Sequence, residues 1–216
     1  MSIGPTVVLL PGLRDIGAQT TALEAALEAA LADAGPVLTP DITVSSTSPV
    51  ILEDPALTVL SAIAAAGINR AVLVGHGWGS MVALQLAATH GERVAALMLS
   101  TNARLETIVL RSLYYGVLNL LPATVVQQLG ARPPQVLDLF DQVRPADFRP
   151  LAERVQAPSL VIVGERDVAN RGPSSVVARS LPLGNLSVVP RAGAGWQAKQ
   201  PQVVAKLLLD FMSGLE

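Results

Sequence analysis

The stretch that decides the fold runs Arg70-Ala-Val-Leu-Val-Gly-His-Gly-Trp-Gly-Ser-Met-Val-Ala-Leu-Gln-Leu-Ala87. It starts with a short apolar run, passes through three glycines spaced two residues apart, and ends in residues that favour a helix. A continuous apolar run of this length is typical of a buried parallel strand. The stretch therefore predicts a strand, a tight turn and a helix, in that order.

Similar apolar runs recur along the chain and alternate with helical patterns. The predicted strands are Val7 to Leu10, Ala71 to Val74, Ala95 to Leu99, Leu160 to Val163 and Leu186 to Val189. Leucines at helical spacing predict one helix through Leu23, Leu27 and Leu31 and a second through Leu57, Leu60 and Ile63. For the second helix we expect Asp54 as N-cap, Pro55 in the first turn and Gly67 at the C-terminal end. This alternation predicts an α/β fold with a doubly wound, mostly parallel sheet, whose ligand site lies beyond the carboxyl ends of the central strands.

One long segment, residues 102–154, departs from the alternation. It is helical in pattern, rich in leucine and interrupted by prolines. We interpret it as a helical cap inserted within a single domain of residues 1–216; the alternative is that it adds further helices to the core.

Composition excludes several classes of function. The net charge is -2, and Lys199 and Lys206 are the only lysines, so there is no basic stripe to bind nucleic acid. No apolar run approaches the roughly 20 residues of a membrane span, and the amino-terminal residues lack the pattern of a signal peptide. Cysteine is absent. We expect a soluble, cytoplasmic protein without membrane contact, metal or cofactor, and the sequence leaves a homo-oligomer open.

The glycine-rich turn resembles the nucleophile elbow of the α/β-hydrolase superfamily. In the motif G-x-S-x-G of that superfamily, a serine stands on a strained turn between strand and helix, and the next residue donates its amide to an oxyanion. Here the frame is Gly75-His76-Gly77-Trp78-Gly79, with Gly77 at the serine position. Ser80 follows the frame, and we interpret it as a helix-start residue rather than a displaced nucleophile.

The resemblance to small esterase-like members extends over nearly the whole chain. Val8 to Leu13 is similar to the strand and first oxyanion loop, and residues 93–104 are similar to the next strand and the entry to the cap. Residues 158–167 resemble the strand that leads to the acid of the triad, which would be Asp167. Residues 188–196 resemble the loop that carries the catalytic histidine, and that position falls on Gly195.

A serine hydrolase needs an activated hydroxyl, an imidazole to take its proton, and an acid to orient the imidazole. The chain has two histidines, His76 in the elbow and His90 at the end of the following helix. Neither fits the base position, so only Asp167 remains of the triad. We therefore expect no ordinary serine-hydrolase activity, although Asp167 remains a candidate acid or base.

The remaining parts predict a binding site. Backbone amides near Leu13 and Trp78 would still donate hydrogen bonds to a carbonyl or carboxylate oxygen, and the leucine-rich segment 102–154 would supply nonpolar walls. The expected ligand-binding residues are Gly12, Leu13, Arg14, His76, Gly77, Trp78, Tyr114, Gly195 and Trp196. Both tryptophans would line the opening or simply fill the core. The function predicted is binding of an apolar small molecule without hydrolysis; the alternatives are a non-hydrolytic enzyme (cyclase, lyase or isomerase) using Asp167, or a hydrolase with an unconventional nucleophile.

Overall fold

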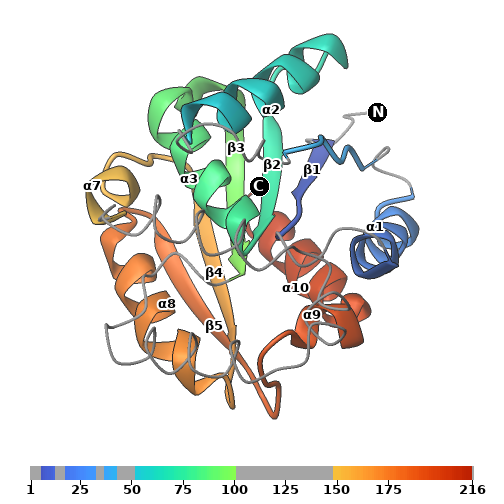
Figure 1. Cartoon of the computed structure of the whole chain (residues 1–216), viewed down its shortest axis with the longest axis vertical. Coiled ribbons are helices and arrows are strands. Elements are labelled where there is room, and N and C mark those ends of the chain that lie inside the picture. The colour runs from blue at the N-terminus through green and yellow to red at the C-terminus, as the bar shows by residue number, and fades with distance from the viewer. Residues whose placement is uncertain (1–5, 13–17, 33–36, 43–51, 101–147, 216) are drawn as a thin grey trace, which may run out of the picture.

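The structure, a computed structural model, describes residues 6–12, 18–32, 37–42, 52–100 and 148–215. In these ranges five parallel strands form one sheet (Figure 1). The strands are β1 (Thr6–Leu10), β2 (Ala71–His76), β3 (Val94–Ser100), β4 (Ser159–Gly164) and β5 (Gly184–Val189), and they lie side by side in that order. All five predicted strands are confirmed.

The direction of chain winding reverses at β1. After β1 the chain passes through helix α1 and makes a short parallel bridge between Leu38 and Val8, on one side of β1. It then returns through helix α2 to β2, on the other side. Connections that leave neighbouring strands in opposite directions create a crevice at the carboxyl ends of those strands. The elbow follows β2, so it lies at this switch point.

Helices cover both faces of the sheet. On one face lie α2 (Glu53–Ala65), α3 (Trp78–Thr89), α7 (Arg149–Ala152) and α8 (Val168–Ser180); on the other lie α1 (Ala18–Ala30), α9 (Trp196–Lys199) and α10 (Pro201–Ser213) (Figure 1). A short 3-10 helix, η1 (Gly91–Arg93), joins α3 to β3.

The two faces of the sheet bury separate apolar cores. Alternate strand residues point to opposite faces, so Leu73 and Leu97 pack under α2 and α3, whereas Val72 and Met98 pack under α1 and α10. All four side chains are fully buried. The predicted doubly wound arrangement is therefore confirmed.

Two details of the predicted second helix are wrong. Its N-cap is Leu52, and Asp54 lies inside the first turn, where its charge favours the helix dipole without capping. The buried face carries Val59 and Ile63, whereas Leu57 is exposed. Gly67 does end this helix in the left-handed conformation, at φ 68°.

The predicted cap falls largely outside the described residues, which resume at Phe148. From there α7 packs against α3 and α8, with Phe148 and Ala152 buried in the core of that face. In the described part of the chain, no helix has the length and apolar character that crossing a bilayer requires.

Candidate functional site

The elbow keeps the strained backbone of a nucleophile turn. Gly77 has φ 53° and ψ -115°, and α3 begins at the next residue, Trp78. The Gly77 amide donates to the Ser100 carbonyl at 3.1 Å, and this hydrogen bond joins the turn to the end of β3. A residue with a side chain rarely adopts this backbone conformation, because it costs about 1–3 kcal/mol. Glycine largely avoids that cost. The prediction that Gly77 occupies the sharp strand-to-helix turn is confirmed.

The two outer glycines of the frame are required for a different reason, which is space. A Cβ on Gly75 would lie 2.7 Å from the Cα of Ser80, and a Cβ on Gly79 would lie 1.9 Å from the carbonyl oxygen of Leu10. Gly75 therefore lies close against the first turn of α3, and α3 lies directly on β1. Of the three, only Gly77 is required because of its backbone conformation.

Ser80 serves the structure of the turn. Its side chain is almost fully buried, and its hydroxyl donates to the Gly75 carbonyl at 2.8 Å, with the Ser100 carbonyl 3.4 Å away. A hydroxyl held by main-chain acceptors of the elbow has a satisfied structural role. This arrangement agrees with the interpretation of Ser80 as a helix-start residue.

The loops after β4 and β5 lie against each other at the carboxyl edge of the sheet. The Arg166 amide donates to the Ala192 carbonyl at 2.8 Å, and the Arg191 amide donates to the Glu165 carboxylate at 2.7 Å. Asp167 ends the first of these loops, and Gly195 ends the second. The positions predicted for acid and base are thus on adjoining loops.

Asp167 is engaged as the N-cap of α8. Its carboxylate accepts from the Asn170 amide at 3.3 Å and from the Asn170 side chain at 2.9 and 2.8 Å, one bond to each oxygen. The side chain is buried. The carboxylate is therefore bonded by a backbone amide, whereas the Arg171 guanidinium donates to the Glu165 carbonyl.

Asp167→Ala is expected to lower the free energy of unfolding by about 1–2 kcal/mol, because N-cap carboxylates satisfy otherwise unpaired helix amides. Asp54→Ala is the matched control, since that carboxylate lies in a first turn without capping, and should change the value by about 0.5 kcal/mol. Urea denaturation followed by circular dichroism measures both. Equal effects of the two substitutions would contradict the capping role.

Gly195 stands at the N-terminus of α9 with φ 68° and ψ 22°, in the left-handed region. A Cβ built there meets nothing within 4 Å. This backbone region is one in which asparagine, aspartate and histidine are enriched among side-chain-bearing residues. The position therefore has room for a side chain, although its positive φ makes any substitution there strained.

The two tryptophans lie on opposite faces of the sheet and are both buried. Trp78 packs under α2, and its Nε1 donates to the Ile42 carbonyl at 3.1 Å. Trp196 packs among the residues under α1 and α10, and its Nε1 has no hydrogen-bond partner within the described ranges. Filling of the core, one of the two roles that we considered, accounts for this burial.

A polar cluster that the sequence did not reveal lies beside the elbow. His76 Nδ1 is 2.8 Å from Ser100 Oγ, and Gln197 Nε2 donates to the same hydroxyl. Ser100 and Gln197 are buried, and His76 is half-buried. In the sequence, His76 and Ser100 each follow one of two successive apolar runs, which could have indicated that these polar residues lie together. Nothing in the sequence marks Gln197 in this way.

Of the other predicted ligand-binding residues, only Gly12 is among the residues that the structure describes. Gly12 is buried just after β1, whereas Leu13, Arg14 and Tyr114 lie outside the described residues. No group of three His, Asp or Glu side chains within the described ranges has the geometry to hold a metal ion.

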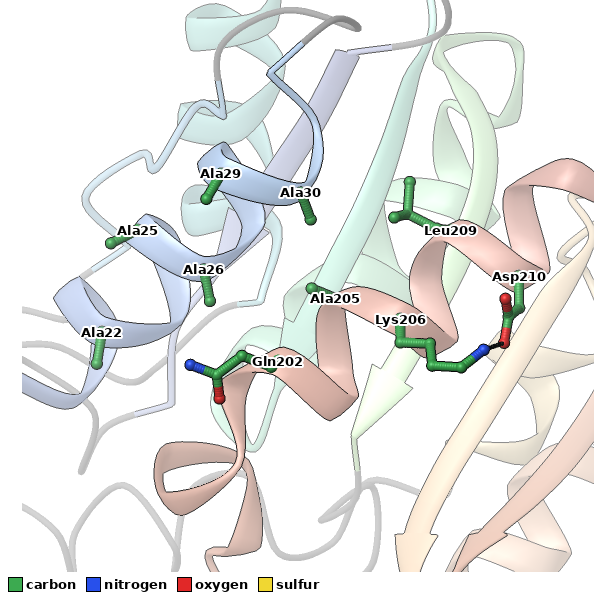
Figure 2. Close-up of a pocket in the computed structure, with 10 residues that line it drawn as sticks. All are labelled: Ala22, Ala25, Ala26, Ala29, Ala30, Gln202, Ala205, Lys206, Leu209 and Asp210. Carbon is green, nitrogen blue, oxygen red and sulfur yellow. Dashed lines mark hydrogen bonds and ion pairs between the residues drawn. The ribbon is translucent and has the colours of Figure 1, made fainter.

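A groove elsewhere on the molecule contains none of the predicted site residues. It runs between α1 and α10 and is lined by Ala22, Ala25, Ala26, Ala29, Ala30, Gln202, Ala205, Lys206, Leu209 and Asp210 (Figure 2). Lys206 and Asp210 form an exposed ion pair of 2.7 Å, one helical turn apart.

Comparison with known proteins agrees with this geometry. A family model described as the alpha/beta hydrolase fold matches residues 56–155. Among solved structures, an enol-lactonase from Burkholderia xenovorans has a TM-score of 0.71 and 22% identity, over 97% of this chain and 92% of that one. A thermophilic esterase from Thermogutta terrifontis has a TM-score of 0.71 and 19% identity, over 98% and 90%. An α/β-hydrolase enzyme from a sediment metagenome of the Mar Chica lagoon, Morocco, has a TM-score of 0.74 and 18% identity, over 98% and 91%.

The chain therefore has the α/β-hydrolase fold that the sequence motifs predicted.

Proposed function

We propose that this protein binds an apolar small molecule with a carbonyl or carboxylate group over its elbow, and that it does not hydrolyse that molecule. The observation that carries the proposal is the conformation of Gly77. The turn keeps φ 53° and ψ -115°, the geometry that presents an elbow to a ligand, although no hydroxyl is attached to it.

Hydrolysis through a serine would need groups that this elbow lacks. Gly77 and Gly195 have no side chain, and the nearby hydroxyl of Ser80 donates to a main-chain carbonyl. A nucleophilic mechanism depends on a hydroxyl within reach of a base. The same turn can still bind substrate-like molecules, because binding requires none of these groups.

The chemistry of the expected ligand is inferred from the backbone of the elbow and from the sequence of residues 102–147. The N-terminus of α3 is at Trp78, and helix N-termini favour anionic or carbonyl oxygens. The segment 102–147 is rich in leucine, which suits a mostly nonpolar ligand. The esterase and the enol-lactonase of the same fold are named for reactions at ester carbonyls, which agrees with a carbonyl-bearing ligand here.

A non-hydrolytic enzyme is the second candidate, with Asp167 as its acid or base. The burial of this carboxylate at the carboxyl edge of the sheet favours it. In that case Asp167→Asn would reduce turnover while affinity stays nearly unchanged. A hydrolase with an unconventional nucleophile is the third candidate.

Binding is tested by calorimetric titration with decanoate and with 2-undecanone, using undecane as the probe without an oxygen. Both oxygen-bearing probes should bind, and undecane should bind at least tenfold more weakly. Gly77→Trp should abolish binding by filling the space over the turn, at a strain of about 1–3 kcal/mol that a domain of ordinary stability tolerates.

Gly195→Trp is a second blocking variant, because a Cβ at Gly195 meets nothing within 4 Å. Gly67→Trp is the matched control, since Gly67 has the same φ of 68°, is equally open and lies after α2. Circular dichroism should show that all three variants are folded. Unchanged binding in both blocking variants would place the ligand elsewhere and overturn the proposal.

A further inference from the structure

Strand β5 differs from the other strands of the sheet in its exposure. All of β2 up to Gly75 is buried, whereas Leu186 and Val188 of β5 are each 39% exposed. Among the described strands, β5 lies at one end of the sheet and pairs with β4 alone (Figure 1). An apolar strand at the edge of a sheet is a place where a further strand can pair.

The hydrogen bonds between β5 and β4 determine which backbone groups of β5 are free. The carbonyls of Leu183 and Val189 accept from amides in and just after β4, each at 2.9 Å. Successive residues of a strand direct their backbone groups to opposite sides, so the odd-numbered residues of β5 face β4. The N–H and C=O groups of Leu186 and Val188 therefore point away from β4, and no other described strand pairs with them.

The β5 edge lacks the features that usually keep an edge strand from pairing with another chain. These features include charged side chains, a proline within the strand, and a bulge. The strand Gly184–Val189 contains neither a charged residue nor a proline, and its register with β4 has no shift. Pro182 and Pro190 lie just outside the strand and limit any pairing to these residues.

The free backbone groups of β5 are complementary to those of a second copy of the strand. In an antiparallel pair, two opposite residues exchange both of their backbone hydrogen bonds. When two copies of β5 are related by a two-fold axis at Ser187, Leu186 lies opposite Val188 of the copy. Every free N–H of these residues then meets a free C=O, and every free C=O meets an N–H.

Other antiparallel registers pair fewer of these groups. Centring the axis on Leu186 places Val188 opposite Gly184 of the copy, whose amide already donates within its own chain at 3.0 Å. Centring the axis on Val188 places Leu186 opposite Pro190 of the copy, which has no N–H. Each of these registers leaves a carbonyl without a donor, so the register centred on Ser187 is favoured.

The side chains and the charge of the chain favour the same partner. Leu186 is paired with Val161, which belongs to the core under α3, so Leu186 and Val188 share that face of the sheet. In the register centred on Ser187, these apolar side chains lie opposite those of the copy, and pairs of this kind stabilise a sheet. The net charge of -2 causes little repulsion between two copies.

We propose that the outer edge of β5 is the interface through which two copies of this chain associate, with the two β5 strands antiparallel about Ser187. The two sheets then form one continuous sheet. The same edge is used by both copies, so the contact closes at a dimer and leaves no β5 edge free. The interface is short, which places the dimer among weak, concentration-dependent assemblies. This inference does not depend on the proposed function.

The register is tested with single cysteines in the full-length chain. The chain contains no cysteine, so Ser187→Cys can form a disulfide only with another copy. At the axis, the two copies of this residue form a non-hydrogen-bonded pair with Cα atoms about 4.5 Å apart, a distance that a disulfide bridges. Asn185→Cys is the matched control, because Asn185 lies on the same face of β5 and is more exposed. The copies of that residue would be more than about 13 Å apart. We expect Ser187→Cys to cross-link at least about tenfold faster under mild oxidation.

The dimer itself is measured by sedimentation equilibrium of the wild type at concentrations up to about 1 mM, where the dimer fraction should rise with concentration. Leu186→Lys should weaken the dimer at least about tenfold, because a lysine on a strand edge opposes pairing. Leu57→Lys is the matched control, since Leu57 is 42% exposed but lies on α2, and it should leave the dimer unchanged. Val188→Pro removes an N–H that does not face β4, so it should weaken the dimer while the chain still folds. Circular dichroism checks the folding of each variant.

Each of three results would overturn the inference. The first is a wild-type protein that stays monomeric over the whole concentration range. The second is a dimer that Leu186→Lys weakens no more than Leu57→Lys does, which would place the interface elsewhere, for example at the groove between α1 and α10. The third is cross-linking of Asn185→Cys as fast as that of Ser187→Cys, which would show random collision or a different register.

Discussion

Gly79→Ala is expected to remove most of the stability of this protein, at least about 4 kcal/mol, which is an exceptional cost for a single methyl group. The added Cβ would lie 1.9 Å from the carbonyl oxygen of Leu10 and 2.4 Å from its carbonyl carbon. Both are backbone atoms of β1, and Leu10 is paired with Gly75 of β2. A flexible side chain could move aside, but here either α3 or a strand of the sheet must shift.

Gly91→Ala is the matched control, because a Cβ at that position meets nothing within 4 Å. Its effect should stay within about 0.5 kcal/mol. Urea unfolding midpoints measure both variants, and the yield of folded protein gives a second readout if Gly79→Ala is too unstable to titrate. A midpoint for Gly79→Ala close to that of the control would show that α3 does not lie against β1 as the structure has it.

The strands and the elbow could be predicted from sequence because each depends on local pattern. A run such as Ala71 to Val74 is apolar on both faces only because helices cover both faces. The three glycines of the elbow follow the same logic, although their reasons differ: Gly75 and Gly79 are required by contact, and Gly77 by backbone conformation. The bridge at Leu38 had no such signal, since a single paired residue makes no pattern.

Side-chain partnerships could not be predicted in the same way. Asp54 and Asp167 each stand near the start of a helix, yet only Asp167 caps one, because the chain turns into α8 one residue after it and into α2 one residue before Asp54. The contact of His76 with Ser100 depends on the register of β2 against β3. The contact with Gln197 depends further on where α9 begins. These contacts depend on tertiary structure, which the pattern of a single sequence does not reveal.

Gly77→Ser combined with Gly195→His is expected to give a protein that reacts with fluorophosphonate probes and hydrolyses p-nitrophenyl butyrate, whereas we expect neither reaction of the wild type. The backbone at Gly77 already has the conformation of an elbow nucleophile, and Gly195 has space for a side chain. A positioned general base contributes about 10²–10⁴-fold. The double variant should therefore exceed Gly77→Ser alone by at least about 100-fold in the rate of probe labelling.

The acid is the remaining requirement, because both oxygens of Asp167 are held by the Asn170 side chain. Adding Asn170→Ala should raise the rate further by releasing the carboxylate to orient the new imidazole. Ala194→His, made in place of Gly195→His, tests the neighbouring position of the same loop. Mass spectrometry must find the adduct on the introduced serine, with Gly77→Ser as the control for background reaction. If no combination labels faster than Gly77→Ser, then the loops after β4 and β5 do not bring an acid and a base to this elbow, and Gly77 and Gly195 are not the places of a lost triad.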